Sequence, residues 1–544
     1  MSESSYVYAD HERPAFPGSP FSPVHSGGRR LAYGLAALVL AVVATLGNGL
    51  VNVNVANLSG SMGVYAAQAS WLPAIYVAMN ATANLTLVKA RAQFGIPQVT
   101  SVLIVGYVLA SAWQLLFPGF LAAGLVRATS GMMAAGLTTL TIYNLIQVFP
   151  PKLKPLGVVI GIGLIQLGMP LARLFPVEML ALDNWRGLHL IEMGLGLTAF
   201  VALHAVRLPP SERSKAFEPL DFLTIGLVVP AALLICGVLS EGRLLWWTDT
   251  PWLGVALATG LGLLALAAAI EVLRARPLMQ LRWLGALDII RFAAVAMLVR
   301  IALAEQTFGA VGLLTAGGLN NDQLHILFSG VVAAMLLGTV VAAVTLSATR
   351  LPYQVMVAAL IIAAGAWWDA HATNLTRPEQ LYGSQALLAF GTTLFIGPAL
   401  LYGLTKMLAK GADHLVTFIV LFSTTQNVGG LVGSAFLGTY QTIAAREHAA
   451  SLAERVVATD PQVMARIQAG ARTVSSAVVD PAAQAAQGVA LLGQALSREA
   501  AILAFNDVFR LVAILALLTA AYVAYVIVFN TLRRRSQAAR ETSS

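Results

Sequence analysis

The sequence predicts an all-α polytopic membrane protein, and its composition and apolar runs carry that prediction. Of its 544 residues, 58% are hydrophobic and only 11% are charged, whereas soluble proteins average about 25% charged residues. Apolar stretches of roughly 20 residues, enough to cross a bilayer as one helix, recur along the chain. A chain this poor in charge cannot cover itself with a wetted surface. Its net charge of +8 therefore indicates basic loops at one membrane face rather than a nucleic-acid partner.

The apolar runs predict 14 transmembrane helices, each long enough to span the hydrocarbon core. A tail at 1–30, rich in Pro, Ser and Gly, precedes the first of them and is expected to be disordered, and a short tail at 531–544 follows the last. The predicted spans are 31–54, 67–88, 98–117, 119–142, 155–175, 187–206, 221–240, 253–273, 288–313, 323–347, 353–369, 383–405, 414–438 and 504–530.

The basic residues orient these spans. With the amino terminus inside, all six lysines fall on the inner side, at 89, 152, 154, 215, 406 and 410. The arginine clusters at 29–30, 274–276 and 533–535 agree. The opposite orientation would violate the positive-inside rule. Both termini are therefore expected in the cytoplasm.

One connection, 440–503, is long, and the orientation places it outside. It contains "TDP" at 459–461 and "VDP" at 479–481, and Asp followed by Pro is a helix-start signal. Apolar residues recur at helical spacing in "ALLGQALSREAAILAFNDVF". Two or three amphipathic helices standing off the membrane are expected there, with a floppy loop as the alternative.

Arg127 lies well inside the fourth span among small residues, including Gly131 and Gly136. A charge at this depth is costly and mostly faces a bundle interior or an aqueous cavity. Gly131, one turn beyond Arg127, lets a neighbouring helix approach closely. Arg127 is interpreted either as a cavity-lining cation that orients a polar network, substrate or proton acceptor, or as a structural arginine bonded to backbone carbonyls.

Two buried carboxylates are candidate proton carriers. Glu305 shares the ninth span with Arg300, but a spacing of five stacks them poorly, so partners on other helices are possible. Glu305 is the first choice for proton coupling. Glu192, three residues after His189, is the second, with a place in the outer headgroup region as its alternative. Glu271 and Asp288, near span ends, are expected to be solvated.

Six amides interrupt apolar spans and are candidate cavity residues. Each could be interhelical glue, but together they indicate a hydrated path through the bundle. They are Asn52, Asn80, Asn84, Asn144, Gln426 and Asn427. The chain has no P-loop, no HExxH motif and only one cysteine, Cys236. No enzyme activity, metal or cofactor is therefore expected.

Four stretches resemble the 14-span drug–proton antiporter family of EmrB/QacA type, in the major facilitator superfamily. They are "RATSG" at 127–131, "DNWRGLHLIEMGLG" at 183–196, "LSEGRLLWWTDTPWLG" at 239–254 and "LAFNDVFR" at 503–510. The likeness runs from about Gly47 to about Arg510. It implies a six-helix half at 31–206, two linker spans at 221–273 and a second half at 288–530, which rock around a central cavity.

The sequence also departs from the family pattern. The first span has no carboxylate, and the fifth-span antiporter signature keeps Gly168 and Pro170 but places Arg173 and Leu174 where glycines belong. The resemblance implies a proton-driven exporter of small amphipathic or aromatic compounds in a bacterial inner membrane, with both termini cytoplasmic. Its external loop would meet a periplasmic membrane-fusion adaptor and, through it, an outer-membrane channel. An importer or uniporter of the same fold, or a non-transporting scaffold or sensor, remains an alternative.

Overall fold

Helices make up 83% of the chain in the structure, a computed structural model that describes residues 12, 14, 19–274, 277–408, 411, 414–457 and 459–541. The described residues form no β-strand beyond one isolated bridge, Pro20 to Ser211. Most of the predicted tail 1–30, and residues 542–544 of the predicted tail 531–544, lie outside the described residues. Residues 27–30 of the first tail already belong to the first helix.

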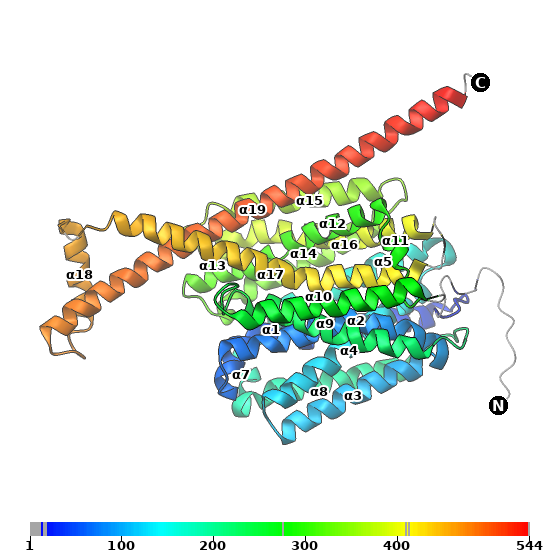
Figure 1. The fold of residues 1–544 in the computed structure, drawn as a ribbon, viewed down its shortest axis with the longest axis horizontal. Coiled ribbons are helices and arrows are strands. Elements are labelled where there is room, and N and C mark those ends of the chain that lie inside the picture. The colour runs from blue at the N-terminus through cyan, green and yellow to red at the C-terminus, as the bar shows by residue number, and fades with distance from the viewer. Residues whose placement is uncertain are drawn as a thin grey trace.

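A first group of helices packs together between Gly27 and Ala205 (Figure 1). The bounds are α1 (Gly27–Met62), α2 (Ala66–Phe94), α3 (Ile96–Leu116), α4 (Phe120–Val148), α5 (Lys154–Ile165), α6 (Gly168–Ala172), α7 (Val177–Leu180) and α8 (Leu182–Ala205). A Cβ at Gly131 would lie 2.6 Å from the carbonyl oxygen of Tyr76, so α4 can approach α2 only because position 131 is glycine. A Cβ at Gly168 would overlap Thr45, which lets α6 pack closely on α1 in the same way.

Two further helices, α9 (Pro219–Glu241) and α10 (Pro251–Leu273), pack on each other, and α9 packs on α2. An ion-pair cluster ties them together: Asp221 contacts Lys89 at 2.6 Å and Arg274 at 2.8 Å, and Arg274 contacts Glu271 at 2.7 Å. Burial alone would lower the pKa of Arg274, but its hydrogen bonds to three carboxylates raise that pKa above its ordinary value. Glu271 is buried in this cluster, so the expectation that it is solvated is wrong. The side chain of Asp288 lies outside the described residues.

The second group is α11 (Leu281–Leu284), α12 (Leu287–Ala302), α13 (Val311–Ala316), α14 (His325–Val344), α15 (Leu351–Asp369), α16 (Tyr382–Leu408), α17 (Leu415–Glu454), α18 (Pro461–Thr473) and α19 (Pro481–Glu541). A π-helical turn, η3 (Glu305–Ala310), separates α12 from α13. Single π-helical turns are rare and frequently mark functional sites. The predicted ninth span at 288–313 is therefore not one regular helix.

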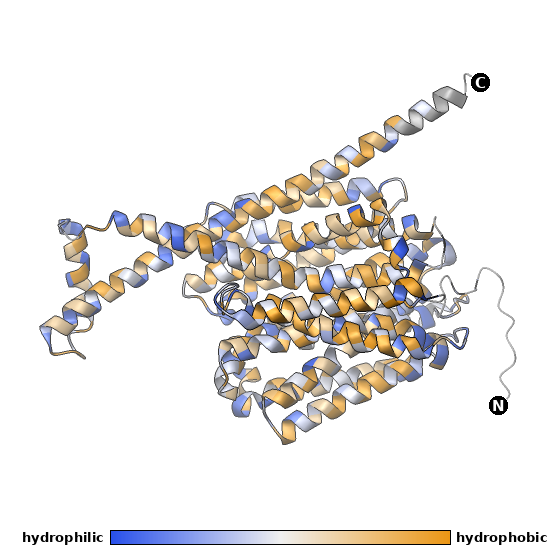
Figure 2. Cartoon of the chain, in the orientation of Figure 1, coloured by the Kyte–Doolittle hydropathy of each residue, from blue (hydrophilic) through white to orange (hydrophobic). Residues whose placement is uncertain are grey.

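The chain is a multi-pass membrane protein. Eleven helical segments among the described residues are long and apolar enough to cross a bilayer. The other three predicted spans fall on α2, on the interrupted α12–η3–α13 segment and on α17, which are not among these eleven. The count of 14 spans stays a prediction. Figure 2 shows apolar residues along the bundle, with hydrophilic residues concentrated towards its two ends.

Two helices leave the bundle at one end. The 61 residues of α19 make a helix about 90 Å long, far more than the roughly 30 Å hydrocarbon core requires. With the end of α17 and with α18 it forms a projecting structure, residues 440–503, which we call the cap (Figure 1). Asp460 caps α18 by accepting a hydrogen bond from the Gln462 amide, and α19 begins directly after Asp480, so both helices start at the Asp-Pro pairs. We call the end of the bundle with the cap the cap face and the end where α1 begins the tail face.

Candidate functional site

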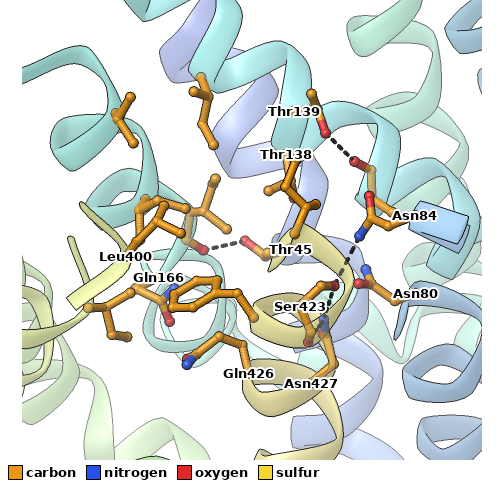
Figure 3. Close-up of a pocket in the computed structure, with 18 of the residues that line it drawn as sticks. Thr45, Asn80, Asn84, Thr138, Thr139, Gln166, Leu400, Ser423, Gln426 and Asn427 are labelled. Atoms are coloured by element: carbon orange, nitrogen blue, oxygen red, sulfur yellow. Dashed lines mark hydrogen bonds between the residues drawn. The ribbon is translucent and has the colours of Figure 1, made fainter. Parts of the chain in front are cut away.

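A cavity of about 340 Å³ lies between the two groups of helices. The first group contributes side chains of α1, α2, α4 and α5, and the second contributes side chains of α12, α16 and α17. Its polar lining is mostly uncharged, and Figure 3 shows part of it. These uncharged polar residues are Thr45, Asn48, Tyr76, Asn80, Asn84, Thr138, Thr139, Tyr143, Gln166, Ser423, Gln426 and Asn427.

Amide side chains connect the two groups across this cavity. Asn84 of α2 donates to the Ser423 hydroxyl of α17 at 3.0 Å, and Asn427 donates to the same hydroxyl at 3.3 Å (Figure 3). Of the six amides singled out in the sequence, Asn80, Asn84, Gln426 and Asn427 line the cavity. Two do not line it. Asn144 donates within its own helix to the Leu140 carbonyl at 2.8 Å, and Asn52 has a buried carbonyl oxygen without a hydrogen-bond partner.

Arg127 and Glu192 form a buried ion pair between α4 and α8. His189 extends the network, with its Nδ1 3.2 Å from Glu192 and its Nε2 3.5 Å from Gln114 of α3. Neither Arg127 nor Glu192 lines the cavity, so the cavity-lining interpretation of Arg127 needs correction. Glu192 is buried within the first group, with its side chain 1% exposed, and its depth in the membrane stays a prediction. The network couples helices within the first group.

A second pair of acids lies in the other group. Gln385 of α16 donates through Nε2 to Glu305 at 3.2 Å and to Asp369 of α15 at 2.7 Å. Both carboxylates are buried, and no salt bridge reaches either of them among the described residues. Two buried acids that share one donor cannot both ionise without strong repulsion, so this arrangement suits one shared proton.

Glu305 and Arg300 have partners on other helices, as their spacing of five residues allows. Arg300 donates through Nε to the Gln426 carbonyl of α17 at 2.8 Å and lines the cavity. Sequence reasoning missed Asp369 as a partner of Glu305. The sequence shows only that Asp369 is an acid at the end of the apolar run 353–369, and an acid in that position can equally well be solvated.

A smaller cavity of about 80 Å³ is lined by Arg300 and by residues close to Glu305 in the sequence. Gln306, next to Glu305, lines it and donates to the Gln385 carbonyl at 3.3 Å. Pro170 and Arg173 of the first group line its other side. Gln306 therefore connects this cavity to the backbone of Gln385, whose side chain donates to both acids.

Hydrogen bonds join the two groups near the cap face. Arg173 donates to the Asn321 side chain at 3.1 Å, and the Asn321 amide donates back to the Arg173 carbonyl at 3.1 Å. The Arg173 guanidinium also lies 5.1 Å from the centre of the Phe328 ring. The large cavity instead extends to Arg91, Leu404 and Leu415, which lie close to the tail-face ends of their helices. This geometry is closed towards the cap face.

The described residues contain no group of three His, Cys, Asp or Glu side chains that could hold a metal ion. Gly136, one of the small residues near Arg127, packs α4 against α3, where a Cβ would lie 3.1 Å from Leu103.

No protein-family profile matches this chain. No curated protein matches it in sequence.

Solved structures do match the fold. The proton:xylose symporter XylE, a major facilitator superfamily protein bound to 6-bromo-6-deoxy-D-glucose, is 14% identical with a TM-score of 0.50, over 90% of this chain and 95% of XylE. A structure reported on substrate recognition in proton-dependent oligopeptide transporters is 12% identical with a TM-score of 0.54, over 92% of this chain and 99% of its own. At these identities the likeness concerns the fold alone. The chain has the fold of major facilitator transporters.

Proposed function

We propose that this chain is a secondary active transporter that exports small amphipathic or aromatic compounds in exchange for protons. The observation that carries the proposal is the cavity between the two helix groups, walled by both and closed on one side by a contact between them. In alternating access, two such groups rock around a central site so that it opens to one face at a time. The tail face, which carries the lysines among the described residues, is the cytoplasmic face in this proposal, and the membrane is a bacterial inner membrane.

Proton coupling is assigned to the Glu305–Asp369 pair. The pair takes up or releases one proton as the groups rock, and Gln306 and Gln385 connect it to the shared cavity. Arg127 and Glu192 are assigned to holding α4 and α8 together in the first group. Export is favoured over import by the resemblance to EmrB/QacA-type antiporters.

The contact at the cap face supplies a test of alternating access. Arg173→Cys and Asn321→Cys, combined with Cys236→Ala, place two reactive thiols where the groups meet. We expect a short bifunctional thiosulfonate to cross-link them and to stop transport in proteoliposomes, because the cap face can no longer open. Reduction should restore transport in the same sample, and each single-cysteine variant treated alike is the control. Undiminished transport by fully cross-linked protein would rule out opening at this contact.

We further propose that the cap docks a periplasmic adaptor that passes substrate to an outer-membrane channel. Gly488 lets α19 approach α18, since a Cβ there would overlap the Ile467 carbonyl. After this internal packing, large apolar side chains remain exposed on the cap: Val456, Val457, Met464, Val479, Val489 and Leu491. Contiguous exposed apolar patches mark interaction surfaces, and we propose that these side chains contribute to one.

Replacing 446–498 with a short Gly/Ser linker should separate the two roles. Transport in vesicles should persist, because every cavity residue lies outside the deleted segment. Whole-cell resistance and co-purification of the adaptor should be lost. An adaptor that still co-purifies with the deleted protein would show that the cap is not its docking site.

A further inference from the structure

All of the charged side chains that line the large cavity, among the described residues, are positive. Its lining includes two arginines, Arg91 and Arg300, and no Asp, Glu, Lys or His among the described residues. Taking a guanidinium out of water is costly unless a partner compensates it. A cavity for neutral or cationic compounds would gain nothing from two such groups, so the lining points to a negatively charged ligand.

Arg300 is held in place by α17. Its Nε is engaged by the Gln426 carbonyl, and its side chain packs over Gly429 and Gly430. A Cβ at Gly430 would lie 2.8 Å from Arg300 Nη2, so the glycine makes room for the guanidinium. The same side chain lines both the large and the small cavity. No carboxylate forms an ion pair with it in the described part of the chain, so its charge is available to a ligand.

Arg91 has an unsatisfied donor. Its Nη2 is buried without any hydrogen-bond partner, and the residue is only 4% exposed. Buried donors of this kind are rare in folded proteins and costly when left unpaired. An anionic group in the cavity would satisfy it.

The two arginines lie at different depths. Asn84 of α2 meets Ser423 of α17. Arg91 is seven residues, about 10 Å, further along α2 towards the tail face. Arg300 contacts Gln426, three residues further along α17 towards the cap face. Between these levels the lining includes the aromatic side chains of Phe418, Phe422 and Tyr143 beside the polar Asn84 and Ser423.

We propose that the substrate is an amphipathic organic anion. Its carboxylate, sulfonate or phosphate headgroup pairs with Arg300, its apolar body lies against the aromatic wall, and Arg91 draws it in from the tail face. This inference rests on the proposed function, since it names the substrate class of the same cavity. A planar guanidinium matches such headgroups with two parallel hydrogen bonds.

The test compares how tightly an acid and its uncharged amide bind to the purified full chain in phosphatidylcholine nanodiscs. Binding is measured by fluorescence anisotropy. Dansylglycine carries the anion, and dansylglycinamide has the same body without the charge. The same comparison is made for 1-naphthoate and 9-anthroate against their amides, by displacement of bound dansylglycine. We expect the acids to bind roughly tenfold or more tightly than the amides, as for a hydrogen bond to a charged group.

Arg300→Gln should bring the acid-to-amide ratio close to one, while Arg300→Lys keeps part of the preference. Arg91→Gln should weaken acid binding with a smaller loss of preference. The control is Arg282→Gln, because Arg282 is exposed and outside the cavity. Equal binding of acids and amides, an unchanged ratio in Arg300→Gln, or no binding by any member of the pairs would overturn the proposal.

A lipid headgroup carries the same chemistry, so a second series adds phosphatidylglycerol to the discs. Displacement of dansylglycine would identify a lipid anion as the occupant, and unchanged binding would identify a soluble anion. Both outcomes keep the anion site. Proton flux is measured separately in proteoliposomes. If the acids bind more tightly than the amides but no proton flux follows, this inference stands and the proposed proton-coupled function is overturned. If only the amides drive proton flux, the proposed function stands and this inference is overturned.

Discussion

Glu305→Gln should abolish pH-driven transport and leave solute exchange at equal pH intact. This result is expected because exchange requires only that the loaded cavity alternate, whereas coupling requires a group that gains and loses a proton. The glutamine keeps the size of the side chain and its place beside Gln385 but cannot be ionised. Asp369→Asn should have the same effect, since the two acids share one donor.

Both activities are measured in proteoliposomes, as uptake driven by a pH gradient and as counterflow of labelled substrate without one. Glu379→Gln is the matched control, because Glu379 lies in the same part of the chain but is exposed. We expect no loss of thermal stability in Glu305→Gln, because glutamine relieves the repulsion between two buried acids and keeps an acceptor for Gln385. If Glu305→Gln and Asp369→Asn both retain pH-driven uptake, the coupling site lies elsewhere.

The second large effect is expected at Arg127. Arg127→Ala leaves Glu192 buried without its cation, which typically costs about 3–5 kcal/mol of stability. We expect a marked fall in melting temperature and loss of transport in both assays. Arg127→Lys should restore stability in part, because lysine lacks the planar fork of donors.

A double variant separates stability from function here. Arg127→Met with Glu192→Leu replaces the pair by apolar side chains of similar size, which is often neutral or stabilising. We expect both its melting temperature and its transport to return close to those of the unmodified protein, because the pair is assigned to holding α4 and α8 together. Low transport by a stable double variant would show that the ion pair has a further role in the transport cycle.

The sequence alone predicts the membrane class and the places of most helices, because repeated apolar runs of about 20 residues are typical of chains that cross a bilayer many times. It also places Asn80, Asn84, Gln426 and Asn427 in spans that meet at one cavity, although it cannot say that Asn52 and Asn144 do not reach it. Which side of a helix faces a cavity depends on how helices rotate against one another, and a single sequence does not contain that rotation.

For a related reason, the sequence does not predict which charged residues pair with one another. Arg127 with Glu192 and Glu305 with Asp369 are separated by 65 and 64 positions, and nothing local connects them. Asp369 lies at the end of an apolar run, where acids are ordinarily solvated, and only the fold turns it inward. Glu271 shows the same limit, since its burial depends on Arg274 and on a neighbouring helix.

The most direct measurement of the central claim is solute-dependent proton flux. The purified chain is placed in proteoliposomes that contain pyranine, and the dye reports internal pH when dansylglycine or 1-naphthoate is added across a preset pH gradient. The account predicts proton movement that requires the solute, is absent in Glu305→Gln and Asp369→Asn, and persists in Glu379→Gln. Binding of these solutes to the cavity without any solute-dependent proton movement in the unmodified protein would contradict it.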